Sequence, residues 1–374
     1  MLYKNALIFK SGRGFMPGSF RVEEGRFAEV MDGCPDDAGI DLEGQKVIPG
    51  LIDLHSHGAM GADFSDGDYE GLKRMAAYLA GQGVTAFAPA SMTLPYDVLA
   101  RAFATAKQLR DEQPEGLSRL MGIQMEGPFF SEKKKGAQNA DYLRLPDAEA
   151  FKAVNDGCGG LVKIADVAPE LEGAEEFIRE VSKISRVSVA HTDADYDAAK
   201  MAFAAGARHL THLFNAMPSI HHRNPGVIGA AAEREDVVAE LICDGLHVHP
   251  SAVRMAFRLF PGRVCLISDA LRCVGMPDGE YELGGQPVFL KDNIARLADG
   301  TIAGSASNLY TCMLNAISFG IPEDTAITAA TLTPARELGC DDRLGSIEVG
   351  KLADFVVCGE DLTRHEVYIG GKRV

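Results

Sequence analysis

The chain has 374 residues and a formal net charge of −16, from 53 acidic and 37 basic side chains. This acidic balance argues against nucleic acid or an anionic membrane surface as the main partner, and no apolar run approaches the ~20 residues needed to span a bilayer. The eight cysteines form no Cys-x-x-Cys pair, a pattern typical of a reduced, cytoplasmic chain. Length and composition therefore predict a cytoplasmic protein with a substantial core.

Both ends of the chain have the composition of short strands with tight turns. FRVEEGRFAEV predicts a hairpin that turns at Glu24-Gly25, and DLEGQKVIP predicts another short strand. GSIEVGKLADFVVC and VYIGGKRV, near the other end, are β-like in the same way. We therefore expect residues 1–49 and 346–374 to form one small β-sandwich domain built from both termini.

Between these ends, apolar runs alternate with helical patterns. The segment YDVLARAFATAKQL, for example, places its apolar residues at helical spacing. The strand candidates are LIDLHSHG, VTAFAPA, LMGIQMEGP, LVKIADVAP, VSVAHTD, HLTHLFN, VVAELICDGLHV and VCLISDA. Eight such units predict a (β/α)₈ barrel over residues 50–345. A doubly wound open sheet is the competing architecture, but no Gly-x-Gly-x-x-Gly follows an early strand.

Reactive side chains fall where the predicted strands end. His55 and His57 are two residues apart, so on a strand they project to the same side. The carboxyl ends of barrel strands meet at one mouth, where catalytic residues of such barrels lie. The later strand ends carry Glu126, His191, His212, His247 and Asp269. Imidazoles and carboxylates that converge in this way predict a site for one or two divalent ions such as Zn²⁺. His209 has the opposite strand parity to His212, so we expect it to pack outside the mouth.

Several motifs carry a family resemblance. PGLIDLHSHG, together with GKLADFVV, resembles the amidohydrolase superfamily. More narrowly, the chain resembles the family of N-acetylglucosamine-6-phosphate deacetylases in the motifs QMEGPFF, AHTDA, THLFNAM, RNPG, DGLHVHP, SDA, AGSAS and TLTPARELG. These motifs cover nearly the whole chain in order.

The resemblance implies specific roles at the metal site. Glu126, His191 and His212 match the ligands of one metal ion, and Asp269 matches the catalytic aspartate. The pair His55 and His57 matches the ligands of a second metal position, which some members of the family retain and others have lost. Zn²⁺ is the expected ion, with Fe²⁺ or another divalent ion as the alternative.

The resemblance also implies substrate contacts. Asn215, Ala216, Arg223 and His247 match positions that contact the phosphosugar. Arg223 is similar to an arginine that reaches the phosphate of the neighbouring subunit's substrate, which implies a homodimer. Gln138 stands where many members carry a substrate-holding histidine.

The activity implied is metal-dependent hydrolysis of the acetamide of N-acetyl-D-glucosamine 6-phosphate, which gives D-glucosamine 6-phosphate and acetate. Amino sugar catabolism and cell-wall sugar recycling use this reaction. The departure at Gln138 keeps a second hypothesis open, a deacetylase for N-acetylgalactosamine 6-phosphate or another N-acylated amine. The remote alternative is a non-catalytic scaffold of the same fold.

Overall fold

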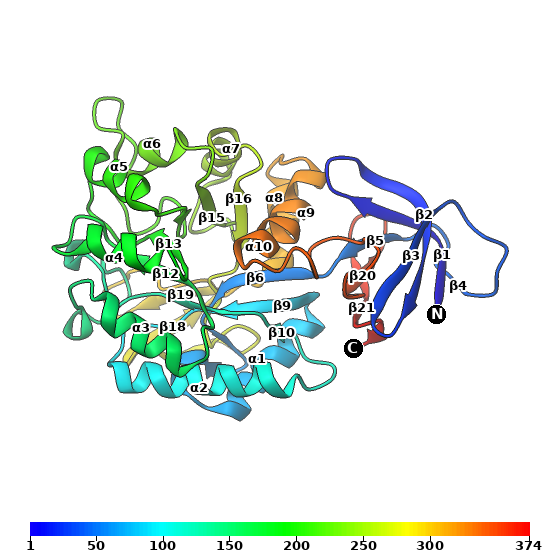
Figure 1. The fold of residues 1–374 in the computed structure, drawn as a ribbon, viewed down its shortest axis with the longest axis horizontal. Helices are drawn as coiled ribbons and strands as arrows, with labels where there is room; N and C mark the ends of the chain where they lie inside the picture. The colour runs from blue at the N-terminus through cyan, green and yellow to red at the C-terminus, as the bar shows by residue number, and fades with distance from the viewer.

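The computed structural model describes residues 1–374, apart from the side chain of His365. Eight parallel strands form a barrel at one end of the molecule (Figure 1). They are β6 (Leu51–Ser56), β9 (Val84–Pro89), β11 (Ile123–Met125), β12 (Val162–Val167), β13 (Arg186–Val189), β14 (His209–Leu210), β15 (Val238–Ile242) and β16 (Val264–Ile267). The two-residue strand β10 (Arg119–Leu120) precedes β11 and pairs with β9 as part of the same barrel position. Single bridges from Ser56 to Ala270 and from Ala90 to Gln124 join the two parallel sheets into a ring. The predicted (β/α)₈ barrel is confirmed.

Helices separate most of these strands and cover the barrel. They are α1 (Tyr69–Gly81), α2 (Tyr96–Glu112), α3 (Ala148–Gly157), α4 (Ala174–Val181), α5 (Tyr196–Ala205), α6 (Gly226–Ala232), α7 (Pro250–Leu259), α8 (Leu309–Ser318), α9 (Glu323–Ala330) and α10 (Leu332–Glu337). Helix α2 shows why they form, because its buried residues recur at helical spacing on one face: Leu99, Ala102, Phe103, Ala106 and Leu109.

Alternation along the strands separates two environments. In β15, Ala239 and Leu241 belong to the apolar cluster that includes the helices. Glu240, between them, hydrogen-bonds side chains of β6 and β14 and therefore points into the barrel. The upper barrel interior is accordingly polar and charged, although it is fully buried.

The chain ends form one eight-stranded sheet beside the barrel (Figure 1). Its strands are β1 (Leu2–Lys10), β2 (Gly14–Glu23), β3 (Arg26–Asp32), β4 (Ile40–Asp41), β5 (Lys46–Pro49), β20 (Phe355–Cys358), β21 (Arg364–Ile369) and β22 (Lys372–Arg373). The hairpin at Glu24-Gly25 is confirmed, with both residues at positive φ. The expected domain bounds at 49/50 and 345/346 stay a prediction.

This terminal sheet curls around an aromatic core. Phe27 of β3 and Phe355 of β20 are four strands apart in the sheet order, which in a flat sheet is about 19 Å. Their ring centroids are nevertheless 6.0 Å apart. Curvature therefore closes the sheet over its own buried face.

A second small sheet follows the last barrel strand and was not predicted. Strands β17 (Gly279–Leu283), β18 (Gln286–Lys291) and β19 (Ile294–Leu297) form an antiparallel meander. The two-residue turns Gly284-Gly285 and Asp292-Asn293, all at positive φ, were the sequence signal for it. Its apolar side packs on Met92 and Leu271 at the barrel mouth.

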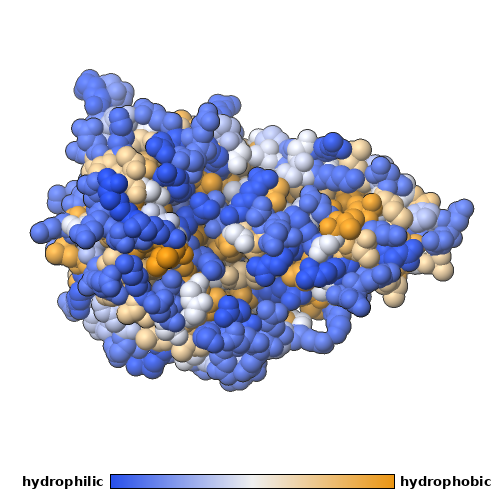
Figure 2. Space-filling view, viewed as in Figure 1, coloured by the Kyte–Doolittle hydropathy of each residue, from blue (hydrophilic) through white to orange (hydrophobic). Residues whose placement is uncertain are grey.

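The face of the molecule seen in Figure 2 is mostly hydrophilic, with small apolar patches. Within the described residues, we find no helix of the length and apolarity that crossing a membrane requires.

Candidate metal centre and active site

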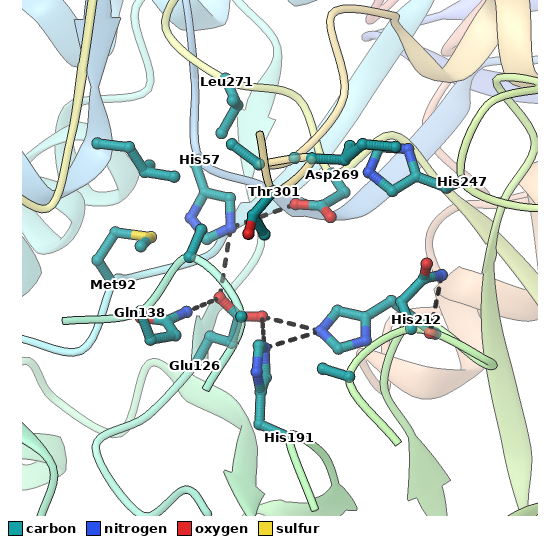
Figure 3. A pocket seen from close by; sticks show the side chains of 18 residues that line it. His57, Met92, Glu126, Gln138, His191, His212, His247, Asp269, Leu271 and Thr301 are labelled. Carbon is teal, nitrogen blue, oxygen red and sulfur yellow. Dashed lines mark hydrogen bonds and ion pairs between the residues drawn. The ribbon is translucent and has the colours of Figure 1, made fainter. Parts of the chain in front are cut away.

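The carboxylate of Glu126 lies at the centre of the barrel mouth (Figure 3). Glu126 directly follows β11 and is 2% exposed. Its Oε1 lies 3.1 Å from Nε2 of both His191 and His212. Its Oε2 lies 3.3 Å from His57 Nε2 and accepts a 2.7 Å hydrogen bond from Gln138 Nε2. Oε1 therefore faces His191 and His212 and lies 3.6 Å from His55 Nε2, whereas Oε2 faces His57 and Gln138.

Glu126, His191 and His212 form a first group with the geometry of a metal site. Nε2 of His191 and Nε2 of His212 lie 3.1 Å apart, each at the same distance from Glu126 Oε1. Ligands about 2.0–2.1 Å from a tetrahedral Zn²⁺ lie roughly 3.4 Å from one another. His191 donates the N–H of Nδ1 to the carbonyl oxygen of Lys134, 2.9 Å away. This leaves the lone pair of Nε2 available to bind a cation. These residues fit a divalent ion.

His55, His57 and Glu126 form a second group whose ligand atoms lie within 4.8 Å of one another. His55 Nδ1 lies 2.9 Å from Glu240 Oε2, and His57 Nδ1 lies 3.1 Å from the carbonyl oxygen of Ala90. Both Nε2 atoms therefore turn toward Glu126. Nε2 of His55 is fully buried and has no hydrogen-bond partner among the described residues. A buried nitrogen of this kind points to a missing ligand, so this group also fits a cation.

Asp269 faces the same cluster from the end of β16. Its Oδ1 lies 3.3 Å from His57 Nε2 and 3.7 Å from His55 Nε2. Burial raises the pKa of Asp269, but the hydrogen bond from His57 and the charges of His55 and His57 outweigh burial, so this pKa is lowered. A Cβ at Gly304 would lie 2.6 Å from the Asp269 carbonyl oxygen, so only glycine fits beside the aspartate.

Strained backbone aims several of these side chains over the mouth. His191, His212, Ala216 and Asp269 have φ values of 43°, 31°, 52° and 51°. Non-glycine residues rarely adopt this left-handed region, which costs of order 1 kcal/mol or more per residue. The chain therefore turns sharply at the strand ends where the predicted site residues lie.

The cluster opens into a cavity of about 230 Å³ with two unlike walls. Met92, Leu271 and Leu283 form an apolar wall on the side of His57. His247 lies on the opposite side in Figure 3, with Asn215 also lining the cavity. His247 Nδ1 lies 2.6 Å from Asp244 Oδ2. Burial lowers the pKa of His247, but this hydrogen bond outweighs burial and the pKa is raised.

Most predicted site residues come together at this cavity. Those that line it are His57, Glu126, Gln138, His191, His212, Asn215, Ala216, His247 and Asp269. His55 lies buried within the same cluster. Arg223 does not line the cavity of a single chain and is exposed in a loop.

His209 does not line the cavity, in keeping with the expectation that it packs outside the mouth, but the sequence did not predict its partners. It lies inside the barrel, hydrogen-bonded to Glu240 and Glu337. Strand β14 has only two residues, and His212 lies beyond it at φ 31°, so strand parity does not extend from His209 to His212. In the sequence, the only sign of this buried carboxylate is that Glu240 interrupts the apolar run VVAELI.

A closed eight-stranded barrel with these histidines and carboxylates at its mouth defines a metal-binding enzyme of the (β/α)₈ class. The amidohydrolase family model matches residues 46–374. The chain is 37% identical over 371 residues to N-acetylglucosamine-6-phosphate deacetylase from Bacillus subtilis, covering 96% of this chain and 93% of that protein. It is also 33% identical over 337 residues to N-acetylgalactosamine-6-phosphate deacetylase from Escherichia coli O157:H7, covering 89% of this chain and 88% of that protein.

Solved structures agree with these relatives. A mutant of N-acetyl-D-glucosamine-6-phosphate deacetylase from Mycobacterium smegmatis, in complex with N-acetyl-D-glucosamine-6-phosphate, superposes with a TM-score of 0.93 and 32% sequence identity. The match covers 100% of this chain and 98% of that one. The chain therefore belongs to the amidohydrolase family and, within it, to the N-acetylglucosamine-6-phosphate deacetylases. The family depends on divalent metal ions, in keeping with the His/His/Glu groups of this chain.

Proposed function

We propose that this chain hydrolyses the acetamide of N-acetyl-D-glucosamine 6-phosphate to D-glucosamine 6-phosphate and acetate. The observation that carries the proposal is the position of Asp269, whose carboxylate lies against the histidine cluster around Glu126 at an open cavity. Full-length similarity to deacetylases of this phosphosugar supports the same reaction. The intact cluster also argues against a non-catalytic scaffold.

Glu126, His191 and His212 would hold the first ion, and His55 with His57 and Glu126 a second. Imidazole nitrogen and carboxylate oxygen suit Zn²⁺, with Fe²⁺ or another divalent ion as the alternative. When bound, a divalent ion lowers the pKa of water toward ~7 and polarises the acyl carbonyl.

Asp269 is the general base and then the general acid. Its lowered pKa keeps the carboxylate ionised near neutral pH, ready to accept a proton from the attacking water. His55 and His57 face Oδ1, so Oδ2 is the oxygen that takes the proton and returns it to the departing amine. The apolar wall of Met92, Leu271 and Leu283 would receive the acyl methyl group.

The sugar phosphate binds away from the reacting amide. His247 donates its Nδ1–H to Asp244, and its raised pKa favours the imidazolium form, whose Nε2–H is then a donor toward the cavity. Asn215 Nδ2 donates to the carbonyl oxygens of His212 and Leu213, which fixes the side chain beside Ala216 at the cavity wall. These residues would hold the sugar and its phosphate.

Arg223 would complete the phosphate site of a second copy in a homodimer. It is exposed and lies outside the cavity of its own chain. Ile220, in the same loop, is an apolar side chain that is 43% exposed. A guanidinium binds phosphate through two parallel hydrogen bonds, so an Arg223 that crosses the interface would supply local positive charge in a chain whose net charge is −16.

Gln138 would contact the substrate through its free amide hydrogen. Its Oε1 accepts from the backbone N–H of Thr93 at 2.7 Å, and one Nε2 hydrogen is donated to Glu126. The second Nε2 hydrogen remains for the substrate. This arrangement differs from a histidine, and together with the Escherichia coli relative it supports N-acetylgalactosamine 6-phosphate, or another N-acylated amine, as the second candidate substrate.

The chain would act in the cytoplasm. All eight cysteines are free, and seven of them are buried, as in proteins of reducing compartments.

The test is amine release from the 6-phosphates of N-acetylglucosamine and N-acetylgalactosamine, and from both sugars without phosphate. We expect the highest kcat/KM for N-acetylglucosamine 6-phosphate, and elemental analysis should find at least one divalent ion per chain. Higher kcat/KM for the galactosamine epimer would select the second candidate. No release from any substrate by metal-loaded protein would refute both.

A further inference from the structure

A ladder of ion pairs, buried except at Arg186, runs through the barrel from its floor to the mouth. Arg186, at the start of β13, lies 3.2 Å from Glu337, at the end of α10. Glu337 Oε2 lies 2.6 Å from His209 Nδ1, and His209 Nε2 lies 2.9 Å from Glu240 Oε1. Glu240 Oε2 then lies 2.9 Å from His55 Nδ1. We call these five residues the ion-pair ladder.

His209 is the cation at the centre of this ladder. Ionised carboxylates only accept hydrogen bonds, so a histidine between two of them must donate from both ring nitrogens and is an imidazolium. Glu337 lies 3.2 Å from the Arg186 guanidinium, and Glu240 accepts three N–H groups, from His55, His209 and the backbone of His212. Burial lowers the pKa of His209, but the two carboxylates outweigh it and raise this pKa to about 9.

The charges of the ladder alternate along its length. Arg186 and His209 are positive, whereas Glu337 and Glu240 are negative, so these four residues sum to zero. Both Glu240 and His209 are fully buried, where an unpaired charge would be very costly. His209 therefore compensates and orients Glu240 from below. That leaves the other oxygen of Glu240 to accept the Nδ1 hydrogen of His55.

We propose that His209 is a positioning residue that, through Glu240, holds His55 with its Nε2 facing Glu126 and Asp269. A histidine that donates one ring nitrogen to a carboxylate presents the other as a ligand atom with fixed orientation. Nε2 of His55 is the buried nitrogen without a hydrogen-bond partner among the described residues. The inference rests on the proposed function and deepens it, because the ladder contacts a side-chain nitrogen of the His55–His57 position, whereas it touches the His191–His212 position only at the backbone N–H of His212.

The test measures metal affinity without using catalysis. Metal-free parent and His209→Gln protein are titrated with Zn²⁺ against a chelator, and Co²⁺ absorption reports how each position fills. We expect His209→Gln to keep the ion held by Glu126, His191 and His212. Affinity at the His55–His57 position should fall about ten- to a hundredfold, the usual loss when a ligand's supporting partner is removed. His55→Ala provides the benchmark for complete loss of that position.

Ser188→Ala is the matched control. Ser188 pairs with His209 in the strand register, is fully buried and hydrogen-bonds Thr211 Oγ1 at 2.6 Å, away from the ladder. Both affinities should stay unchanged in that variant. If His209→Gln fails to fold, Glu337→Gln is used in its place. This substitution removes one charge but keeps an acceptor for His209, so we expect a smaller loss of metal affinity at the His55–His57 position.

The outcomes separate the ladder from the reaction. Unchanged affinities in the His209 and Glu337 variants, equal weakening of both ions, or a parent that binds a single ion would each overturn the proposed role of His209. A parent that releases no amine from either 6-phosphate, yet loses His55–His57 affinity on His209→Gln, would refute the proposed function and leave the positioning role standing.

Discussion

The terminal sheet and the upper barrel interior bury opposite kinds of side chain. The sheet closes over stacked and edge-on rings, such as Phe355 with Tyr368 at 4.4 Å and Phe20 with Phe355 at 5.0 Å between centroids. The barrel instead buries carboxylates and imidazoles, with Glu240 and His209 both at 0% exposure. Aromatic burial stabilises directly, whereas a buried ion pair is often no better than apolar packing of the same volume. The contrast indicates that the sheet is built for stability and the barrel interior for the chemistry of its mouth.

Asp269→Asn should separate catalysis from stability most sharply. The substitution is nearly isosteric but removes the proton acceptor, so kcat should fall about 10²–10⁴-fold. Because asparagine keeps the side-chain volume and a hydrogen-bond acceptor for His57, Tm and metal content should remain near those of the parent. Steady-state kinetics, thermal unfolding and elemental analysis check this. Turnover within a few-fold of the parent would exclude Asp269 as the proton carrier.

Phe355→Ala should have the opposite effect and reduce stability without reducing kcat. Truncation of a fully buried aromatic ring costs about 3–5 kcal/mol, whereas the ring lies in the terminal sheet, outside the residues that line the cavity. Denaturant unfolding should therefore show a large loss of stability, with kcat of the folded protein unchanged. Met16→Ala, an exposed position in β2, is the control and should change stability by less than about 0.5 kcal/mol. A stable but inactive Phe355→Ala protein would contradict this division.

Arg223→Ala should act on one substrate class only. A charge-assisted hydrogen bond is worth roughly 1.5–3 kcal/mol, so kcat/KM for the 6-phosphate should fall about 10- to 100-fold. The unphosphorylated sugar should be hydrolysed as before. Arg258→Ala, at an exposed position of α7, is the control for loss of surface charge. Equal losses on both substrates would assign Arg223 a structural role.

The smallest effect should be a pH dependence of stability that comes from the barrel. The pKa of His209 is about 9 in the folded protein and ~6.5 in an unfolded chain. A raised folded pKa stabilises fully below pH ~6.5, and this stabilisation is lost as pH rises through about 9. Tm should therefore fall by a few degrees between pH 7 and pH 9.5, and less in His209→Gln. An identical fall in both proteins would show that other groups cause it.

Much of this molecule follows from patterns that its sequence displays. Apolar runs locate the barrel strands, and the shared carboxyl edge of parallel strands explains why His191, His212 and Asp269 meet. The assigned roles of these residues stay predictions. The ion-pair ladder could not be predicted from the sequence. Strand β14 has only two residues, so the alternation of side chains along a strand does not place His209, and the sequence does not show which residue pairs with Glu240. The β17–β19 meander lies outside the eight alternating strand–helix units, and only its two-residue turns mark it in the sequence.

The pairing of β5 with β20, in which Ile48 lies opposite Val356, has a consequence for synthesis on the ribosome. All barrel strands and helices lie between β5 and β20 in the chain, so they leave the ribosome before β20 does. During that interval the β1–β3 hairpins lack Phe355 and Tyr368, and their aromatic side chains remain uncovered. The newly made chain therefore spends most of its translation with half of an aromatic core exposed, and ribosome-bound chains that end before Phe355 should be the preferred clients of chaperones.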